Sequence, residues 1–481
     1  MSSDKTFRDM ICKDPTDLDA RGVFADWLME QGDPRGTFIA QQIELAQMTG
    51  FEKNYPERLA STLRLQAAHG QQWLAEILQL IPVKQSEYGR ITIDSLQNAV
   101  FKNGFVQRLA IKPQDISSNW KKLTALEPVT GIELLVSEAL HDDSFNPPVA
   151  KTWNQLKVSP EGWVTAFTIS QILNWDLSNL NSLDLSGCDL GVDGACMLVG
   201  QKTTLGDFHE TFVPPPPLSN KLRHLKLMNT KLTDEGLQLL LDFKPLQALE
   251  SLDIAQCGAA EQTLESLKKL KKLKSLNLSG NQCDLSQLEG WPVLKKLESL
   301  SLPQSVTEEM FQAIFPAPSP KLKELRLSSA KDLLKNPKLV ASAAKKWLHL
   351  DVGSSAIGDA GLQTLLGEKS MKSVVHLFLN KCGLSDDGVA SLLDCGLKRL
   401  VTLDISSNKL TDASIEQLAA SDLLNHLAHL RIRNNRKLTA KCYEALAAAD
   451  EFQPVSFDIG KCKDTKVERM LVERFGDAMV F

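Results

Sequence analysis

From residue 183 onward, short segments with one shared pattern of apolar and polar positions recur along the chain. Each reads apolar, any residue, apolar, any two residues, and then Cys, Asn, Thr or Ser, with a single Ala exception. The eleven segments begin at Leu183, Leu225, Leu252, Leu276, Leu300, Leu325, Leu350, Leu377, Leu403, Leu430 and Phe457. After a first gap of 42 residues the gaps are 27, 24, 24, 25, 25, 27, 26, 27 and 27. A period of this size predicts one strand and one helix per repeat, stacked side by side into a curved solenoid.

Two features of the pattern have a physical explanation. The paired apolar residues, such as Leu403 and Ile405, point to one face of a short strand, and neighbouring repeats stack them into a core. The sixth residue of the pattern, here called the turn position, lies where the chain turns inward and leaves buried backbone groups that need partners. Asn, Ser and Thr can satisfy such groups locally. The turn positions are Cys188, Thr230, Cys257, Asn281, Ser305, Ala330, Ser355, Cys382, Asn408, Asn435 and Cys462. Ala330 has no polar side chain, so a water or an irregular turn is expected there.

Several repeats continue into a helix start, because Thr, Ser and Asp precede an apolar helix face in 232–237, 357–362, 384–389 and 410–415. These stretches resemble the ribonuclease-inhibitor-like and cysteine-containing classes of leucine-rich repeat, over about residues 180–462. The expected fold is α/β: a right-handed leucine-rich repeat solenoid with parallel strands on the concave side and helices on the convex side. Repeats between Leu276 and Leu325 are shorter, so shorter helices or irregular turns are expected there.

Residues 1–85 show helical spacing of apolar residues instead. Helices are predicted over 16–31, 37–48 and 56–80, and the run from Gly32 to Gly36 separates the first two. Between 86 and 175 the repeat pattern is degenerate, and 90–93, 106–111 and 132–136 are interpreted as strands of divergent repeats that cap the solenoid. A final helix with Val467, Met470 and Leu471 is expected to cover the last repeat.

The segments 24–28 (FADWL), 30–39 (EQGDPRGTFI), 101–109 (FKNGFVQRL) and 472–477 (VERFGD) occur in this order along the chain. Together they resemble the bacterial repeat-companion domain, which precedes leucine-rich repeats in proteins of planctomycetes and myxobacteria. The resemblance implies a bacterial origin and an architecture, and it implies no reaction. The expected organisation is a small helical companion domain over 1–85, divergent N-terminal repeats over 86–175, the solenoid over 176–462 with a Pro-rich insertion near 201–220, and a C-terminal cap helix over 463–481.

Composition narrows the possible functions. The formal net charge is -5 and Lys and Arg are dispersed, which argues against a nucleic-acid partner. No segment has the length and apolarity of a membrane span, and no secretory signal is evident. The nine Cys form no Cys-x-x-Cys pair, which indicates reduced structural thiols in a cytoplasm. We expect a cytoplasmic protein, a monomer, without a metal or other cofactor.

The candidate binding residues lie on the strands, where side chains beside the apolar pair face the concave side. Aromatic and Arg side chains there could anchor a folded partner while charges set its register. The candidates are Lys226, Arg326, Asp351, His376, Phe378, Asp404, Arg431 and Arg433. The alternative is a merely solvated concave surface, with binding on a rim or on the N-terminal domain.

Two further features allow a plain and a functional interpretation. His349 and His376 lie in adjacent repeats near Asp351, but a metal site needs three or four ligands and the next strand offers only Thr402. A pH-sensitive partner contact is the other possibility. The run Pro214–Pro217 is a polyproline II ligand or, more simply, a stiff spacer.

No catalytic motif for hydrolysis, metal-dependent proteolysis, phosphate binding or dinucleotide binding occurs, so no enzymatic activity is expected. The sequence therefore predicts a non-catalytic scaffold that binds a protein partner on its concave face. The alternative is a regulator, an inhibitor or activator, of a partner enzyme such as a small GTPase or a nuclease, by analogy with ribonuclease inhibitor and the Ran GTPase-activating protein. For that role Arg433, Asn434 and Asn435 are the nearest candidates.

Overall fold

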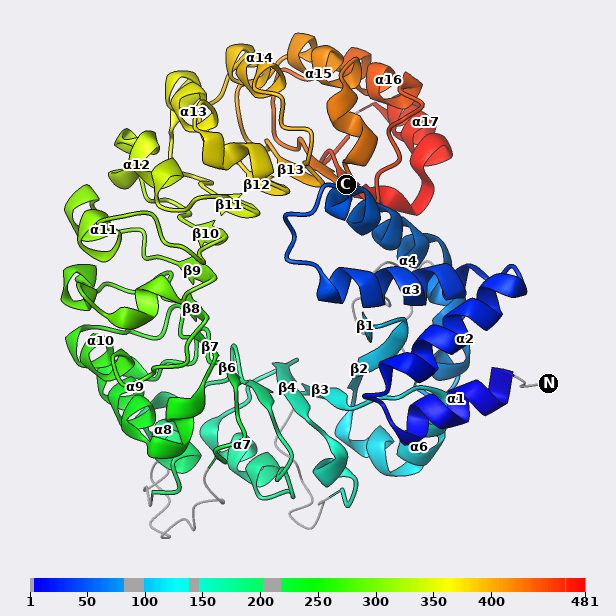
Figure 1. Cartoon of the computed structure of the whole chain (residues 1–481), viewed down its shortest axis with the longest axis vertical. Coiled ribbons are helices and arrows are strands. Elements are labelled where there is room, and N and C mark those ends of the chain that lie inside the picture. Colours follow the sequence, from blue (N-terminus) through cyan, green and yellow to red (C-terminus); the bar gives the residue numbers. More distant parts are fainter. Residues whose placement is uncertain (1–3, 82–98, 138–146, 202–217, 463, 481) are drawn as a thin grey trace. The chain divides into compact units, whose positions relative to one another are not determined.

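A computed structural model of the chain describes residues 4–81, 99–137, 147–201, 218–462 and 464–480 (Figure 1). The chain divides into two compact units, and each is described by itself. The first unit comprises Met1–Ala46 and His69–Val293, and the second comprises Gln47–Ala68 and Leu294–Phe481. In each unit the strands of the repeats follow one another in chain order, with helices on the outer side (Figure 1).

The first unit begins with helices and a hairpin, followed by the first repeats. The helices are α1 (Asp4–Lys13), α2 (Leu18–Glu30), α3 (Pro34–Gln47), α4 (Tyr55–Leu78), α6 (Pro113–Leu126), α7 (Ala166–Leu173), α8 (Gly191–Leu198), α9 (Thr233–Asp242) and α10 (Glu261–Leu267). The strands are β1 (Ala99–Lys102), β2 (Phe105–Ile111), β3 (Gly131–Val136), β4 (Gln155–Pro160), β5 (Ser182–Asp184), β6 (His224–Lys226), β7 (Ser251–Asp253) and β8 (Ser275–Asn277). Short 3-10 helices are η1 (Ala150–Thr152), η2 (Lys244–Ala248), η3 (Leu285–Leu288) and η4 (Pro292–Lys295). Helix α3 ends, and helix α4 begins, in residues that belong to the second unit.

The second unit contains the remaining repeats. Its strands are β9 (Ser299–Ser301), β10 (Glu324–Arg326), β11 (His349–Asp351), β12 (His376–Phe378), β13 (Thr402–Asp404), β14 (His429–Arg431), β15 (Ser456–Asp458) and β16 (Met479–Val480). Its helices are α11 (Glu308–Ile314), α12 (Pro337–Ser342), α13 (Gly358–Leu366), α14 (Asp386–Asp394), α15 (Asp412–Ala419), α16 (Ala440–Ala448) and α17 (Thr465–Phe475). The 3-10 helices are η5 (Leu333–Lys335), η6 (Lys369–Ser373), η7 (Asp422–His426) and η8 (Gly476–Ala478).

The strands pair in parallel with the register that the repeat pattern predicts. Leu325 pairs with Leu350, and Leu377 pairs with Leu403, so the apolar residues form one continuous row. The exception is the hairpin of β1 and β2, which is antiparallel. Leu350, Leu377 and Leu403 are fully buried, which confirms the core face deduced from the period-2 pairs.

The turn positions link each repeat to the preceding one. Asn408 accepts hydrogen bonds at Oδ1 from the backbone N–H groups of Cys382 and Leu384, at 3.0 and 3.1 Å. Its Nδ2 donates to the carbonyls of Leu379 and Ile405, both at 2.9 Å. Asn281 and Asn435 form equivalent bonds. The buried amide therefore satisfies four backbone groups that have no partner within their own strand.

Cysteine and alanine at the turn position behave differently from asparagine. The Cys382 thiol donates to the Val352 carbonyl at 3.3 Å, and burial raises the pKa of this thiol to about 11. All nine cysteines are free thiols, as expected from their spacing. At Ala330 the turn closes through the backbone, with N–H donation from Ala330 to Leu327 and from Lys331 to Ser329. This tight turn agrees with the irregular turn expected there.

Aspartates at the helix starts link the repeats on the convex side. Asp386 accepts from the backbone N–H of Thr411 at 2.8 Å and from its hydroxyl at 2.5 Å. Asp359 binds Ser385, and Asp412 binds Thr439, in the same way. Burial works to raise the pKa of Asp386, but the bonds from Thr411 outweigh it and hold that pKa below its usual value. Each helix start is therefore capped by the repeat before it.

The N-terminal helices and the β1–β2 hairpin share a core with buried charges. Arg35 and Glu127 are 2% and 1% exposed, and their side chains form an ion pair of 2.5 Å between Nη2 and Oε1. The ring of Phe105 lies 4.8 Å from the Arg21 guanidinium and 5.0 Å from that of Arg35. Gly104 has φ +81°, and a Cβ there would lie 2.1 Å from Ile39 Cγ1, so only glycine fits.

In the second unit, residues Gln47–Ala68, here called the strap, cover the N-terminal ends of the strands. The residues just before successive strands form one apolar cluster with Ala60 of the strap. These residues are Leu348, Val375, Val401 and Ala428, and Phe51, Tyr55, Leu59 and Leu63 of the strap pack against the cluster. Arg399 donates to the strap carbonyls of Gly50 and Glu52 at 2.7 and 2.9 Å. The strap thus fills a row that would otherwise expose apolar residues of four repeats.

Some elements differ from the sequence-based predictions. The predicted helix 37–48 begins at Pro34, because proline is favoured in the first turn and Asp33 accepts from the Arg35 N–H at 2.8 Å. Helix α1 and strand β4 were not predicted, since both precede the regular repeats. The shorter middle repeats have only the 3-10 helices η3 and η4 between β8 and β9, as expected. The predicted strand 90–93 and the run Pro214–Pro217 lie outside the described residues.

The predicted helices over 16–31 and 56–80 correspond to α2 and α4, and the strands over 106–111 and 132–136 correspond to β2 and β3. In α17, Val467 and Leu471 are buried, while Phe475 lies 5.5 Å from the Phe457 ring of β15. The domain boundaries expected from the sequence stay predictions.

Replacement of Asn408 by Ala is expected to lower the free energy of unfolding by roughly 2–3 kcal/mol, because it leaves buried backbone groups of two repeats without partners. Urea unfolding followed by circular dichroism measures this loss. The exposed neighbour Lys409→Ala is the control and should change stability by less than about 0.5 kcal/mol. Equal losses in the two variants would contradict the linking role of the amide.

Replacement of Arg399 by Met keeps the aliphatic stem but removes both hydrogen bonds to the strap. Amide hydrogen exchange is expected to speed up in 49–64 while the strands β12 to β14 stay protected, because the strap opens separately from the repeats. Lys398→Met, at an exposed neighbouring site, is the matched control. Unchanged strap protection in Arg399→Met would show that the strap is held without the Arg399 bonds, by the apolar cluster and by Arg64, which donates to the Gln453 carbonyl at 2.8 Å.

Candidate functional site

The candidate site is the concave strand face of the second unit. Two positions per strand face it: the last residue of each strand and the residue two positions further on. The last residues of β9 to β15 are Ser301, Arg326, Asp351, Phe378, Asp404, Arg431 and Asp458. The residues two positions further on are Pro303, Ser328, Gly353, Asn380, Ser406, Arg433 and Gly460. Parallel pairing places Phe378 next to Asp404 and Asp404 next to Arg431.

The aspartates of this face have a structural task. Asp351, Asp404 and Asp458 each accept a hydrogen bond from the backbone N–H two residues later, at 2.8, 3.0 and 3.0 Å. Asp404 is only 6% exposed and also accepts from the Ser406 hydroxyl. Asp and Asn commonly close such short turns, so the spacing itself was a signal that sequence reasoning missed. Two of the predicted partner-binding residues, Asp351 and Asp404, are thus also used to end their strands.

Phe378 is the only aromatic side chain among the last residues of β9 to β15, and it is held in place by its neighbours. Its ring stacks on His349 of the adjacent strand, with centroids 5.0 Å apart and planes inclined by 29°. His376, a predicted site residue, lies beside His349 with ring centroids 5.9 Å apart. The His376 Nδ1 is 2.9 Å from the Thr402 hydroxyl. The aromatic anchor expected from the sequence is therefore half-buried and supported from one side.

The two arginines predicted as anchors lie two residues apart, with Arg431 at the end of β14 and Arg433 just after it. Arg431 and Arg433 keep 47% and 53% of their side chains exposed. Their nearest carboxylates are Asp404 at 3.7 Å and Asp458 at 3.5 Å, and both of these side chains are at least nine-tenths buried. Because the carboxylates also accept backbone hydrogen bonds, each guanidinium keeps donors that face solvent.

The remaining predicted residues lie at the edges. Arg326 on β10 is 41% exposed, 3.7 Å from Glu324, and donates to the Ser299 hydroxyl at 3.4 Å. Lys226 is exposed on β6 of the first unit. The structure therefore brings Phe378, Asp404, Arg431 and Arg433 together on neighbouring strands, with Arg326 and Asp351 on the strands before them.

Burial keeps the histidines of this face neutral. It lowers the pKa of His349 to about 3, and the nearby charge of Arg326 lowers it further in the same direction. It also lowers the pKa of His376 to about 4, with added repulsion from His429 and Arg326. Within the described residues no group of three His, Cys, Asp or Glu side chains could hold a metal ion. Asp351 uses one carboxylate oxygen for Gly353 and the other for the Ser328 hydroxyl.

The residues considered for a GTPase-activating role lie at the C-terminal end of β14. Asn435 is 5% exposed, and its amide oxygen and nitrogen are occupied by the bonds of the turn position. Asn434 adopts φ +60° in the turn. Of the three, Arg433 and Asn434 are exposed, whereas Asn435 is buried. Across the described ranges, which end at residue 480, no helix combines the length and apolarity needed to cross a membrane.

A family model for the leucine-rich repeat matches residues 176–199, 218–241, 347–366 and 399–419. No curated protein matches this chain. A chain of the yeast Rad7 and Elc1 complex is 20% identical, with a TM-score of 0.40, over 53% of this chain and 74% of that one. The internalin inlF of Listeria monocytogenes is 19% identical, with a TM-score of 0.33, over 74% of this chain and 97% of that one.

The TLR13–ssRNA13 complex gives 20% identity and a TM-score of 0.41, over 74% of this chain and 49% of that one. With the matched repeats and the strand order, the α/β leucine-rich repeat fold expected from the sequence is confirmed, including strands on the concave side and a helical N-terminal region. The matched segments lie in both units.

The neutral histidines predict loss of stability in mild acid. Below the usual histidine pKa of about 6.5, the unfolded chain binds protons that buried His349 and His376 do not, so the free energy of unfolding falls as the pH drops from 7 to 5. Urea unfolding at several pH values should show a shallower fall for His349→Phe, which keeps a ring against Phe378. His426→Gln, on η7 away from this face, should keep the full fall. Identical slopes in His349→Phe and wild type would contradict the assignment.

Proposed function

We propose that this chain is a protein-interaction scaffold that binds a folded protein partner on the concave face of the second unit. The surface is centred on Phe378, Arg431 and Arg433, with Arg326 at its edge. Lys226 is a candidate for a separate contact on the first unit. The proposal includes no reaction of its own, since the residues of this face hold one another rather than converge on a reacting centre.

The supported position of Phe378 is the observation that carries the proposal. The Phe378 ring is stacked on His349 and has already lost most of its conformational freedom. A partner that covers the ring therefore causes little further loss of conformational entropy. Aromatic and Arg side chains dominate the binding energy of protein interfaces when a partner desolvates them. Here one aromatic ring and two half-exposed guanidiniums lie within three neighbouring strands.

The charge of the face supports a folded partner with mixed charge. Arg326, Arg431 and Arg433 lie among Asp351, Asp404 and Asp458, so neither sign dominates. Interspersed charges fix the register of a partner and discourage wrong ones, but they attract no strongly charged polymer. Control of a partner enzyme is compatible with this surface. Since Asn435 is occupied by the fold, an activating contact would fall to exposed Arg433 or Asn434, whereas an inhibitor would act by covering the partner.

We infer in addition that the N-terminal helices and the β1–β2 hairpin form a repeat-companion domain of the bacterial type. Arg35, Gly104 and Phe105, which belong to the motifs of that resemblance, lie in one buried core with Glu127. Motif residues that build such a core would recur in related domains because the core needs them. The domain then serves to support the repeats.

The test replaces Phe378, Arg431 and Arg433 together by Ala and compares this triple variant with wild type for a partner captured from source cells and then purified. Calorimetry is expected to show that the triple variant binds the partner at least about 100-fold more weakly than wild type does, because the anchors are removed. The control replaces Lys466, Arg469 and Val472 on α17 by Ala, and should bind as wild type does. Circular dichroism verifies the fold of both variants. Equal affinities for all three proteins would place the binding surface elsewhere.

A further inference from the structure

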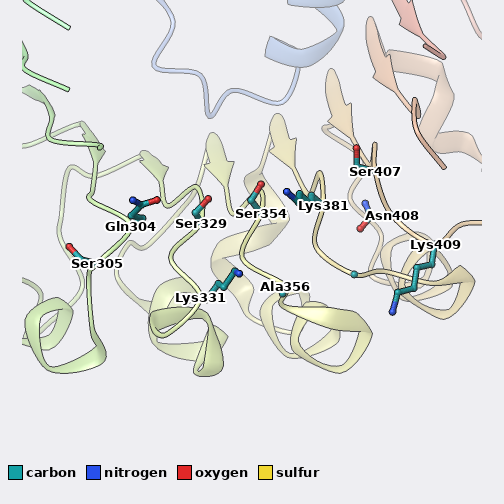
Figure 2. A pocket seen from close by; sticks show the side chains of 11 residues that line it. Gln304, Ser305, Ser329, Lys331, Ser354, Ala356, Lys381, Ser407, Asn408 and Lys409 are labelled. Atoms are coloured by element: carbon teal, nitrogen blue, oxygen red, sulfur yellow. The ribbon is translucent and has the colours of Figure 1, made fainter. Parts of the chain in front are cut away.

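A second surface of the second unit differs in chemistry from the concave face. It is a shallow groove of about 610 Å³ along the loops that follow β9 to β13. Figure 2 shows its side chains on successive loops, with Gln304, Ser329, Ser354, Lys381 and Ser407 following one another from repeat to repeat. Lys331, Ala356 and Lys409 lie on the helix side of that row (Figure 2).

The groove carries a positive charge from three lysines. Lys331, Lys381 and Lys409 are exposed, and no ion pair to any of them is found within the described residues. Three carboxylates of the same loops and helix starts form bonds to other groups. Asp332 pairs with Lys335, Asp359 binds Ser385, and Asp386 binds Thr411. In a chain of net charge -5, three free lysines along one groove favour an anionic ligand.

The polar lining favours an extended peptide over a nucleic acid. Ser329, Ser354 and Ser407 provide hydroxyl groups, and Gln304 an amide, that can bond to a peptide backbone. None of the described residues that line the groove is aromatic, whereas single-stranded nucleic acids bind through stacking on aromatic rings. Five strands at about 4.8 Å spacing span about 19 Å, which is the length of roughly six extended residues.

The backbone fixes the positions from which these side chains project. Ser329, Ser354, Lys381 and Ser407 have φ between +54° and +70°, a left-handed conformation that glycine would adopt with less strain. Their N–H groups donate to the next repeat at 2.7 to 2.9 Å, so the loops are held as a rigid row. A prearranged row of donors needs little reorganisation when a ligand binds.

We propose that this groove binds an acidic, extended peptide segment, rich in Asp and Glu, through Lys331, Lys381 and Lys409 and the hydroxyl groups between them. The site goes beyond the proposed function, because it uses none of the concave-face residues. It could hold an acidic tail of the same partner while the concave face holds the folded part.

The experiment measures fluorescence anisotropy of a fluorescein-labelled peptide of eight glutamates with the full chain in low salt. Wild type is expected to bind, with affinity that falls as salt is added. Replacing Lys331, Lys381 and Lys409 together by Gln should weaken binding about tenfold, since each exposed charge pair contributes about two- to fivefold. The matched control replaces Lys321, Lys338 and Lys345, which are equally exposed and change the net charge equally, and should bind as wild type does.

Three outcomes would overturn the inference: no binding to wild type, equal weakening in the two triple variants, or tighter binding of a single-stranded oligothymidylate with the same dependence on Lys331, Lys381 and Lys409. The last would assign the groove to nucleic acid. Phe378→Ala should leave the peptide affinity unchanged. Failure of the groove can therefore be distinguished from failure of the concave-face proposal, which depends on Phe378, Arg431 and Arg433.

Discussion

The repeats depend on one interaction, the satisfaction of buried backbone groups where each strand turns inward. A strand of three residues cannot pair these groups itself, and burial makes an unpaired group expensive. Asn408 solves this with one amide that bonds to four backbone groups in two repeats. Thiols and hydroxyls at the same position make fewer bonds, as at Cys382 and Ser355. Strand register, the apolar row and the exposed rim all follow from this turn.

The use of side chains to satisfy backbone groups also limits which side chains of the concave face can bind a partner. Asp351, Asp404 and Asp458 face the partner side, yet their oxygens end the strands. Recognition is left to side chains that the fold does not use, above all Phe378, Arg431 and Arg433. The strap imposes a second limit because it covers the row just before the strands, whereas Arg431 and Arg433 on the face and Lys331, Lys381 and Lys409 after the strands stay exposed. The two proposed surfaces lie in these accessible parts.

Much of the repeat structure was predictable from the sequence, for a physical reason. A strict spacing such as that from Leu377 to Leu403 fixes strand, core face and turn together, because each is local and repeated. The aspartate turns were present in the spacing but were read as partner contacts. The strap was not predictable, since its contacts join Gly50 and Arg399, more than three hundred positions apart. Likewise, the neutral state of His349 depends on burial that no local pattern reveals.

The bonds between repeats run in both directions along the chain. Asp386 of one repeat caps Thr411 of the next, whereas Asn408 of the later repeat completes the turn of Cys382 in the earlier one. During synthesis a newly made repeat therefore meets a finished cap but leaves its own turn open until its successor arrives. The growing end is always one repeat short of completion. If the ribosome pauses between two repeats, the last turn of the nascent chain has backbone groups without hydrogen-bond partners. The next repeat, or a strand from another molecule, can then bind these groups.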